Sequence, residues 1–139
     1  MKPLPAEGGK ALREAIATRL EAIIDPCSVA SNVPAGLVSM GLVRDIEIDE
    51  RPGGARVRVT LCITEPGCMM GAIFSANAQR ALAALPGVAE AEVRVDYSYV
   101  WDREDLAPEY RRRLDKAREQ RLAHMKALQL VAVSKQRGG

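Results

Sequence analysis

The sequence predicts an α+β domain of two layers, in which two helices cover one face of a three-stranded sheet and a further helix follows at the C-terminus. Two patterns predict this class. Apolar residues alternate with polar ones in residues 42–50, 56–64 and 90–97, which is the period of a half-buried strand. They recur at three- and four-residue steps in residues 10–24 and 69–85, and more loosely in 108–130, which is the period of a helix. The predicted order is helix–strand–strand–helix–strand, then the C-terminal helix.

Composition narrows the class of protein. At 139 residues with 47% apolar content the chain can bury one core, so we expect one domain. Residues 1–100 carry a net charge of −2 and residues 101–139 a net charge of +4. Three cysteines without a C-x-x-C pair fit neither a disulfide framework nor a closed zinc site, and they favour a reducing compartment, the cytoplasm. No apolar run has the length of a signal-peptide core or approaches the ~20 residues of a membrane span.

The first part of the chain is predicted as an unpacked lead-in, a helix and a long connection. Residues 1–9 contain two prolines, two glycines and little to bury. In residues 10–24 the leucines and isoleucines share one helical face, and Pro26 disfavours helical geometry at Asp25, so the helix should end there. Residues 25–41 are rich in small and turn-forming residues, and connections of this length are often functional.

The next two strands are predicted as a hairpin. Residues 42–50 alternate with one acidic face, and residues 51–54, Arg-Pro-Gly-Gly, turn the chain. The partner strand, residues 56–64, carries Arg56 and Arg58 on its polar face. We expect both arginines to lie opposite the acidic residues of the first strand.

Cys68 is the first candidate for chemistry. Pro66 and Gly67 cannot extend the preceding strand, and after Cys68 the apolar spacing becomes helical. Cys68 is therefore predicted at a helix N-terminus, where unpaired backbone N–H groups and the helix dipole favour a thiolate. A buried structural thiol is the alternative, but placement in a Pro-Gly turn favours a reactive or metal-ligating one.

The last part of the chain is predicted as a third strand and a helix. Pro86-Gly87 turns the chain into the strand. Three aromatic residues at the end of this strand are spaced two apart and so fall on the same face: Tyr97, Tyr99 and Trp101. They either cover the core, which is more typical, or form a partner surface. The C-terminal helix should begin at Pro108, a favoured first helical residue.

Four short motifs occur along the chain in a fixed order. They are Asp25-Pro26 after the first helix, Gly41-Leu42-Val43 before the first strand, Thr64-Glu65-Pro66-Gly67-Cys68, and Leu85-Pro86-Gly87-Val88. With these motifs the sequence resembles the SufT and PaaD-like family of small iron–sulfur cluster assembly proteins, which serve metal–sulfur cluster biosynthesis. The implied organisation is a lead-in (1–9), an iron–sulfur-assembly-like α+β domain (10–105), a charged C-terminal helix (106–130) and a frayed tail (131–139).

The resemblance implies a function. It is that of an accessory factor for iron–sulfur cluster assembly, or for maturation of a metal-dependent enzyme such as a multicomponent oxygenase. Such a factor acts by transient cysteine ligation rather than by turnover. The residue that the family relies on corresponds to Cys68, in a loop that also contains Thr64, Pro66 and Gly67.

A second loop departs from the family pattern. Relatives have an acidic residue after Asp-Pro, where this chain has Cys27, and an Asp where it has Ser39. The family fold brings this loop towards Cys68. Two thiolates and Asp25 would then form a soft, incomplete site for a transient iron–sulfur cluster, iron or zinc. A client apo-protein, another assembly factor or a second subunit in a homodimer would complete it. A Cys27–Cys68 disulfide is an open alternative.

Two further functions stay open on the sequence alone. One is a thiol redox switch or thiol enzyme that uses Cys68 and Cys27, and the other is a non-catalytic interaction subunit. Trp101 and the basic run Arg111, Arg112 and Arg113 form a candidate partner surface. Acidic residues interrupt the run, which argues against nucleic-acid binding, and no membrane attachment is expected.

Two other potential ligands are expected to be unimportant. Cys62 falls on the polar face of its strand and is expected to be a surface or interface residue. His124, the single histidine of the chain, falls on the C-terminal helix and is expected to be solvated.

Overall fold

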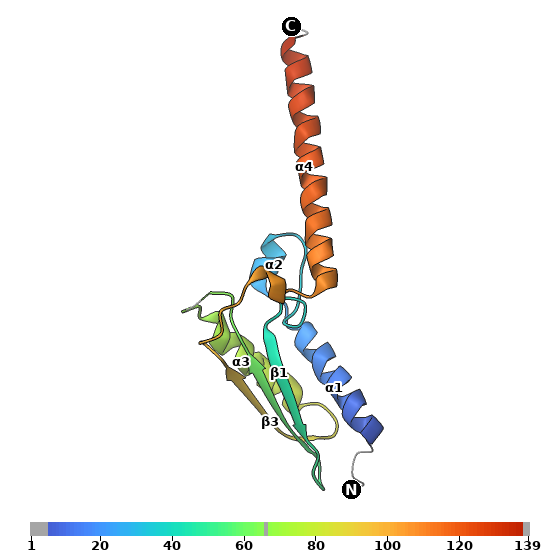
Figure 1. The fold of residues 1–139 in the computed structure, drawn as a ribbon, viewed down its shortest axis with the longest axis vertical. Helices are drawn as coiled ribbons and strands as arrows, with labels where there is room; N and C mark the ends of the chain where they lie inside the picture. Colours follow the sequence, from blue (N-terminus) through green and yellow to red (C-terminus); the bar gives the residue numbers. More distant parts are fainter. Residues whose placement is uncertain (1–5, 66, 138–139) are drawn as a thin grey trace. The chain divides into compact units, whose positions relative to one another are not determined.

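The computed structural model describes residues 6–65 and 67–137, and it has the predicted α+β fold (Figure 1). It divides into two compact units, residues 6–107 and 108–137 as far as described. Its elements are α1 (Ala6–Glu21), α2 (Pro26–Ala30), β1 (Val43–Asp49), β2 (Ala55–Leu61), α3 (Met70–Ala83), β3 (Val88–Val95), a short 3₁₀ helix η1 (Arg103–Asp105) and α4 (Pro108–Arg137).

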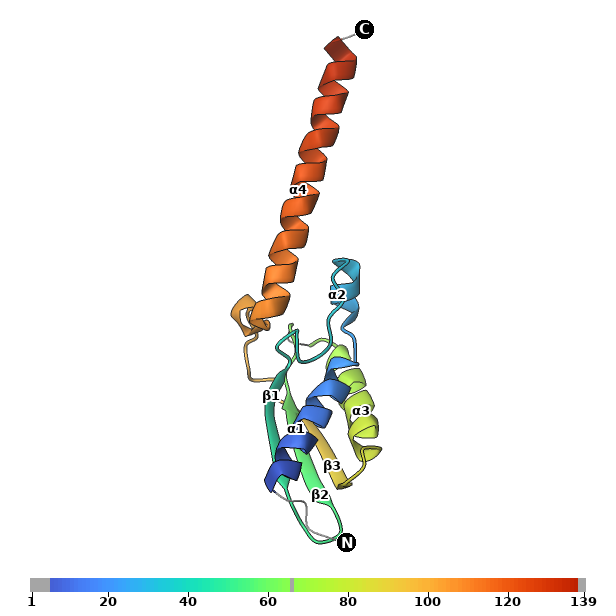
Figure 2. The same cartoon turned by 90° about the vertical axis from the view of Figure 1, so that its right-hand side faces the viewer.

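The sheet has the order β1-β2-β3 and is mixed. β1 and β2 are antiparallel, as expected of a hairpin. β2 and β3 are parallel, and α3 is the crossover between them. Helices α1 and α3 contact each other and cover the same face of the sheet (Figure 2). The core between the layers consists mainly of Leu12, Ile16, Leu20, Val57, Val59, Leu61, Phe74, Ala78, Leu82 and Val93.

The opposite face of the sheet carries a ladder of charges. Arg58 on the central strand lies 3.7 Å from Glu47 of β1 and 3.1 Å from Glu92 of β3. Arg56 lies 3.5 Å from Glu90 of β3 and pairs with Asp49 of β1 in the strand register. The prediction that the two arginines lie across from the acidic residues of β1 is therefore confirmed. The ion pairs are partly exposed, so they contribute more to register than to stability.

Helix α1 begins earlier than predicted. It starts at Ala6, so residues 6–9 belong to the helix and not to an unpacked lead-in, whereas residues 1–5 lie outside the described part of the chain. A glycine inside a helix costs only about 1 kcal/mol relative to alanine, and two glycines near the first turn do not prevent the helix from forming.

The connection 25–41 contains a short helix that we did not predict. Asp25 is the N-cap of α2, and its carboxylate accepts a hydrogen bond of 3.1 Å from the backbone N–H of Ser28. Pro26 is the first helical residue, a position where its fixed φ and missing N–H are favourable. Helix α1 ends at Glu21, so the prediction that it continues to residue 24 is wrong. The Asp-Pro pair starts α2 rather than ending α1, and this role was not recognised in the sequence.

Helix α4 forms the second unit. It runs to Arg137, so the prediction of a helix ending at residue 130 and a frayed tail from 131 is wrong for residues 131–137, and residues 138–139 lie outside the described part. No proline or glycine lies between Pro108 and Gly138, so the sequence contains no signal that would end the helix at residue 130. Among the described residues no helix is both long enough and apolar enough to cross a membrane.

Candidate functional site

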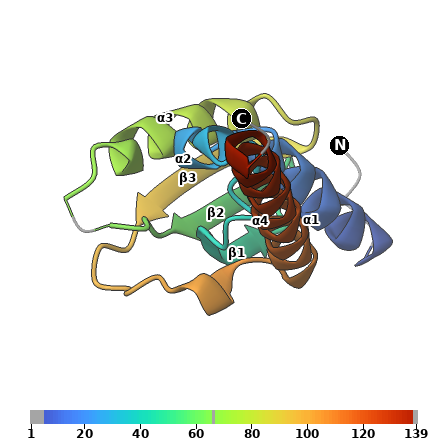
Figure 3. The ribbon, with the colours of Figure 1, turned by 90° about the horizontal axis from the view of Figure 1, so that it is seen from above.

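The two candidate cysteines lie at the same end of the sheet, where β2 and β3 end and β1 begins. Three segments meet there: the connection 22–42, the loop 62–69 and the segment 96–107 that follows β3. Figure 3 looks onto this end and shows α2, the start of α3 and both loops around it. The N–H of Cys62 donates to the carbonyl of Leu42 at 2.8 Å, which joins the first two segments. The N–H of Asp96 donates to the carbonyl of Leu61 at 2.7 Å, which joins the third segment to the end of β2.

Cys68 lies directly before α3. The N-cap of the helix is Met69 and the first helical residue is Met70, so Cys68 is one residue outside the cap rather than in the first turn. Its side chain is half-buried, and its N–H donates to the carbonyl of Glu65 at 3.2 Å. The preceding Gly67 has φ +81° with open space around it, which suits an exposed turn. Pro66 lies outside the described residues.

Cys27 is exposed in the first turn of α2. It lies beside Asp25, whose side chain is only 4% exposed. Burial raises the pKa of Asp25 despite hydrogen bonds from the backbone of Ser28 and Cys27 that act in the opposite direction. Asp25 therefore caps the helix that presents Cys27, and its carboxylate acts on the thiol through its charge.

The thiol of Cys27 is surrounded by negative charge. Its pKa is raised first by the carboxylate of Asp25, then by burial, and further by the Cys68 thiolate and the Glu65 carboxylate. Within residues 6–65 and 67–137 no group of three or more His, Cys, Asp and Glu side chains is placed to hold a metal ion. The residues present fit half of a thiolate metal site and not a complete one.

Ser39 supports the connection and does not reach the cysteines as a ligand. Its backbone N–H donates to a carboxylate oxygen of Glu21 at 2.9 Å, and its hydroxyl donates to the other carboxylate oxygen. Its carbonyl accepts from the N–H of Ala107 at 2.9 Å. A hydroxyl can donate to Glu21 where an ionised carboxylate could only repel it, so Ser39 ties the connection to the end of α1.

The aromatic residues after β3 differ in how far their side chains are buried. Trp101 is half-buried and its Nε1 donates to the carbonyl of Met40 at 2.8 Å, so its polar group is used inside the unit. Tyr97 is 60% exposed, and its hydroxyl lies 3.0 Å from where a Cβ on Gly71 would be. Together with Val100 and Thr64, Tyr97 and Trp101 line a small cavity of about 30 Å³.

A charged cluster that we did not predict fixes the third segment. The guanidinium of Arg44 lies 3.2 Å from the carboxylate of Asp105 and 3.8 Å from the ring centre of Tyr99. The hydroxyl of Tyr99 donates to the same carboxylate at 2.8 Å. These contacts hold the segment 96–107 against the start of β1. Arg44 and Asp105 are 61 positions apart, so no local pattern could have revealed the pair.

The expectation that Cys62 is a surface residue is wrong. Its side chain is 1% exposed, and burial raises the pKa of its thiol to about 11. The thiol lies 3.6 Å from the carbonyl of Gly41. β2 ends at Leu61, so the alternation of faces stops there and the chain turns both Cys62 and Ile63 inward.

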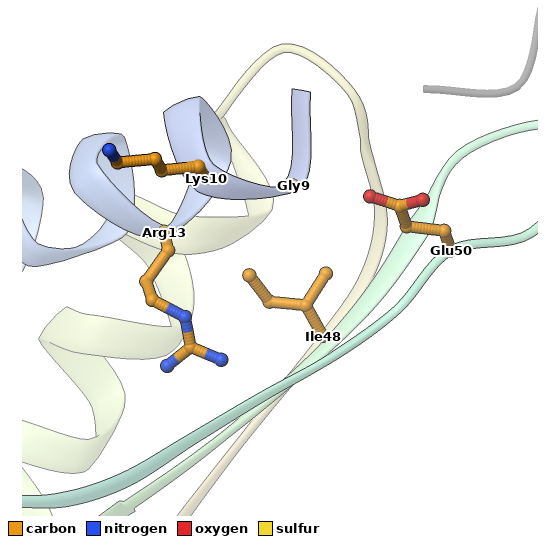
Figure 4. Close-up of a pocket in the computed structure, with 5 residues that line it drawn as sticks. All are labelled: Gly9, Lys10, Arg13, Ile48 and Glu50. Carbon is orange, nitrogen blue, oxygen red and sulfur yellow. The ribbon is translucent and has the colours of Figure 1, made fainter. Parts of the chain in front are cut away.

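The remaining candidates lie elsewhere. Arg111, Arg112 and Arg113 are on α4, in the other unit, and their role as a partner surface stays a prediction. His124 is exposed on the same helix, as expected. An open depression lies at the far end of the sheet, between the start of α1 and the end of β1 (Figure 4). Its lining of Gly9, Lys10, Arg13, Ile48 and Glu50 contains no thiol or histidine.

Comparisons with known proteins identify the family of the chain. The sequence matches the model of a family described as iron–sulfur cluster assembly protein over residues 13–95, which include all three cysteines. It is 31% identical over 98 residues to the Fe-S protein maturation auxiliary factor YitW of Bacillus subtilis, which covers 70% of this chain and 88% of that protein. An uncharacterized protein of Methanocaldococcus jannaschii is 31% identical over 84 residues, or 60% of this chain and 80% of that one.

Solved structures show the same fold. A crystal structure of a domain of unknown function, DUF59, from Bacillus anthracis superposes with a TM-score of 0.61 at 28% identity, covering 76% of this chain and 93% of that one. A conserved hypothetical protein from Thermotoga maritima gives a TM-score of 0.54 at 29% identity, with 72% and 90% covered. Because the family match spans more than half of the chain, including the whole sheet, this chain belongs to the iron–sulfur cluster assembly protein family.

Proposed function

We propose that this protein is an auxiliary maturation factor that takes up an iron–sulfur cluster, or its iron, through Cys68 and Cys27 and passes it to a client protein. Cluster and metal are cargo, not resident cofactors. The named activity of the Bacillus subtilis relative, Fe-S protein maturation, supports this proposal. The family match over residues 13–95 supports it independently.

The observation that carries the proposal is the accessibility of two thiols in segments at one end of the sheet. Cys27 is exposed in α2, and Cys68 is half-buried directly before α3. Thiolates are the preferred ligands of iron–sulfur clusters and bind zinc as well. Because the chain lacks a third ligand among the described residues, it can hold cargo only weakly by itself. Weak holding suits transfer better than storage.

The client that we propose is an apo-protein that receives its cluster after folding, and a multicomponent oxygenase is the type of enzyme that the family resemblance suggests. Met69, directly after Cys68, is 82% exposed and would be available for such a contact.

Anaerobic reconstitution with iron and sulfide tests the proposal. The reduced full chain should acquire visible charge-transfer absorbance and bound iron, and it should restore a cluster to an apo-ferredoxin added as acceptor. Cys68→Ser should lose both properties, and Cys27→Ser should retain less iron. Cys62→Ala is the matched control, since its thiol is buried and should not bind metal. Equal iron retention in all three variants would refute the cysteine mechanism.

A redox switch is the second candidate, because the same two thiols could form a disulfide. Oxidation by diamide would join the two sulfurs, with the two protons and two electrons passing to the diamide. A disulfide requires the Cα atoms to approach within about 7 Å. A rapid mass loss of two hydrogens in the native chain, together with failure of cluster transfer, would favour the switch over the maturation factor.

A further inference from the structure

Helix α4 presents an apolar run to solvent. The helix is continuous (Figure 1), and it lies beyond residues 13–95, the part of the chain that the family model matches. Every residue from Arg118 to Gln136 is exposed. Within this stretch, nine of the twelve residues 122–133 are apolar, and Lys126 is the single charged one. At about 1.5 Å per residue this apolar run is about 18 Å long.

The large apolar side chains of the run surround the helix instead of forming one stripe. Successive residues are about 100° apart around the axis, so Leu128 and Leu130 lie on nearly opposite sides. They are 55% and 71% exposed. The other four have exposed fractions of 46% to 57%, and they are Leu122, Met125, Val131 and Val133. A helix that is apolar on all sides is normally covered on all sides. A groove on a globular protein, or one further helix, covers a single side.

The charges around the run identify the chemistry of what covers it. Residues 120–137 contain four basic residues and no acidic one. Arg121 directly precedes the apolar run and Lys135 follows it closely, so a cation lies at each end. The three acidic residues of α4 all lie in positions 109–119. The complementary partner is therefore apolar along the run and negatively charged at its two ends.

A bilayer that contains anionic lipids has both properties. Its headgroups carry negative charge, and its fluid acyl chains can cover a helix on every side. We infer that α4 binds such a bilayer, with residues 122–133 among the acyl chains and Arg121 and Lys135 at the headgroups. Lys126 reaches the headgroups by its long aliphatic stem.

The length of the run limits how the helix attaches. About 18 Å is shorter than the roughly 30 Å of a hydrocarbon core, so α4 enters one leaflet only. This agrees with the finding that no helix among the described residues is long and apolar enough to cross a membrane. The attachment is peripheral and reversible, because it depends on the charge of the lipid.

Attachment of α4 to a bilayer differs from the expectation drawn from the sequence, which was that the protein does not attach to membranes. That expectation considered the basic run 111–113, near which acidic residues lie, and not the acid-free second half of the helix. Attachment also goes beyond the proposed function and does not depend on the cysteines. A second copy of α4 is a poorer partner, because it brings more positive charge and covers one side only.

Flotation of the full chain with phospholipid vesicles tests the inference. We expect binding to phosphatidylcholine vesicles with about 30% phosphatidylglycerol, and at least about tenfold weaker binding to phosphatidylcholine alone. Raising the salt from about 0.1 to about 1 M shortens the Debye length from about 10 to about 3 Å and should weaken the binding. Arg121→Gln combined with Lys135→Gln should weaken it at least about tenfold, because each cation contributes near the surface.

Leu128→Gln and Leu130→Gln test the apolar contact from the two sides of the helix. Each should weaken binding to the anionic vesicles at least about fivefold, because an amide replaces an apolar side chain among the acyl chains. Val29→Gln is the matched control, since Val29 is 52% exposed but lies in the first unit, and it should bind as the native chain does. Circular dichroism without lipid checks that each variant remains folded.

Three results would overturn the inference. One is a chain that does not bind the anionic vesicles. Another is binding that either leucine variant leaves unchanged, which would mean that charge alone or one side of the helix makes the contact. The third is a dimer in sedimentation velocity without lipid that Leu128→Gln dissolves, in a chain that ignores vesicles, because a second copy would then cover the run. Cys68→Ser should bind vesicles normally, so failure of cluster transfer and failure of lipid binding are distinguishable.

Discussion

Cys62 is in the same region as the two accessible thiols, yet its environment removes it from their chemistry. At 1% exposure with a thiol pKa of about 11, it is both shielded and almost entirely protonated at neutral pH. Its burial could not be predicted, because strand alternation indicates a face only while the strand continues. β2 ends at Leu61, two residues before the last apolar residue of the pattern, and the apolar pattern itself does not mark that end.

The order of thiol reactivity follows from these environments. In native chain treated with iodoacetamide at pH 8, Cys68 should be alkylated first and Cys27 second, because negative charge disfavours the Cys27 thiolate. Cys62 should react only after unfolding, since about one thiol in a thousand is ionised three pH units below its pKa. Peptide mass spectrometry against time gives the three rates. Labelling of Cys62 at the rate of Cys27 would contradict its burial.

Asp25→Asn provides the control for the Cys27 rate. Asparagine is also a good N-cap, so α2 should persist while the charge beside the thiol is lost. The pKa of Cys27 should fall and its alkylation at fixed pH should accelerate, whereas the rate of Cys62 should not change. An unchanged pH–rate profile for Cys27 would show that Asp25 is not the main cause of its raised pKa.

At the scale of elements, the connection 22–42 is fixed by close backbone approaches that only glycine permits. A Cβ on Gly36 would lie 1.7 Å from the carbonyl oxygen of Glu21, and one on Gly41 would lie 2.0 Å from that of Asp105. Gly41 also has φ +71°. A glycine in a sequence indicates a turn, but the segment that approaches it is distant in the chain and has no local signature. The long connection could therefore be predicted, but its rigid attachment could not.

Gly41→Ala and Gly53→Ala form a matched pair. Both positions have positive φ, but Gly53 has nothing within 4 Å of the added methyl group. Gly53→Ala should lower the free energy of unfolding by about 1 kcal/mol, the cost of left-handed backbone. Gly41→Ala should cost at least about 2 kcal/mol more, because the backbone at Asp105 must move. Urea unfolding measures both, and equal costs would show that the contact with Asp105 is not rigid.

For the whole molecule, the division into two units predicts independent behaviour. The sequence has clear apolar periodicities in the strands and in the two helices of the first unit. We predicted from them the order of the elements and the placement of α1 and α3 on one face of the sheet. The extent of α4 was not predicted, because its apolar stripe is thin and becomes irregular towards the C-terminus. Apolar periodicity arises from the helix face that packs on a core. A helix that buries few side chains therefore shows only a weak periodicity, and its ends are hard to predict.

A chain that ends at Ala107 should fold without α4. The residues up to 107 form a compact unit with its own core, and Ala107 retains its hydrogen bond to Ser39. Its thermal unfolding should be cooperative, with a midpoint within about 5 °C of the full chain. Circular dichroism and calorimetry provide the comparison. A broad or absent transition would mean that α4 contributes to the core.

The charged ladder on the open face of the sheet also affects how the protein behaves when concentrated. β1 is an edge strand, and Asp45, Glu47 and Asp49 line it at every second position. Two copies that tried to extend their sheets through this edge would bring rows of carboxylates together, and natural proteins use such edge charges to prevent that pairing. The ladder therefore protects against fibrillation as well as fixing register.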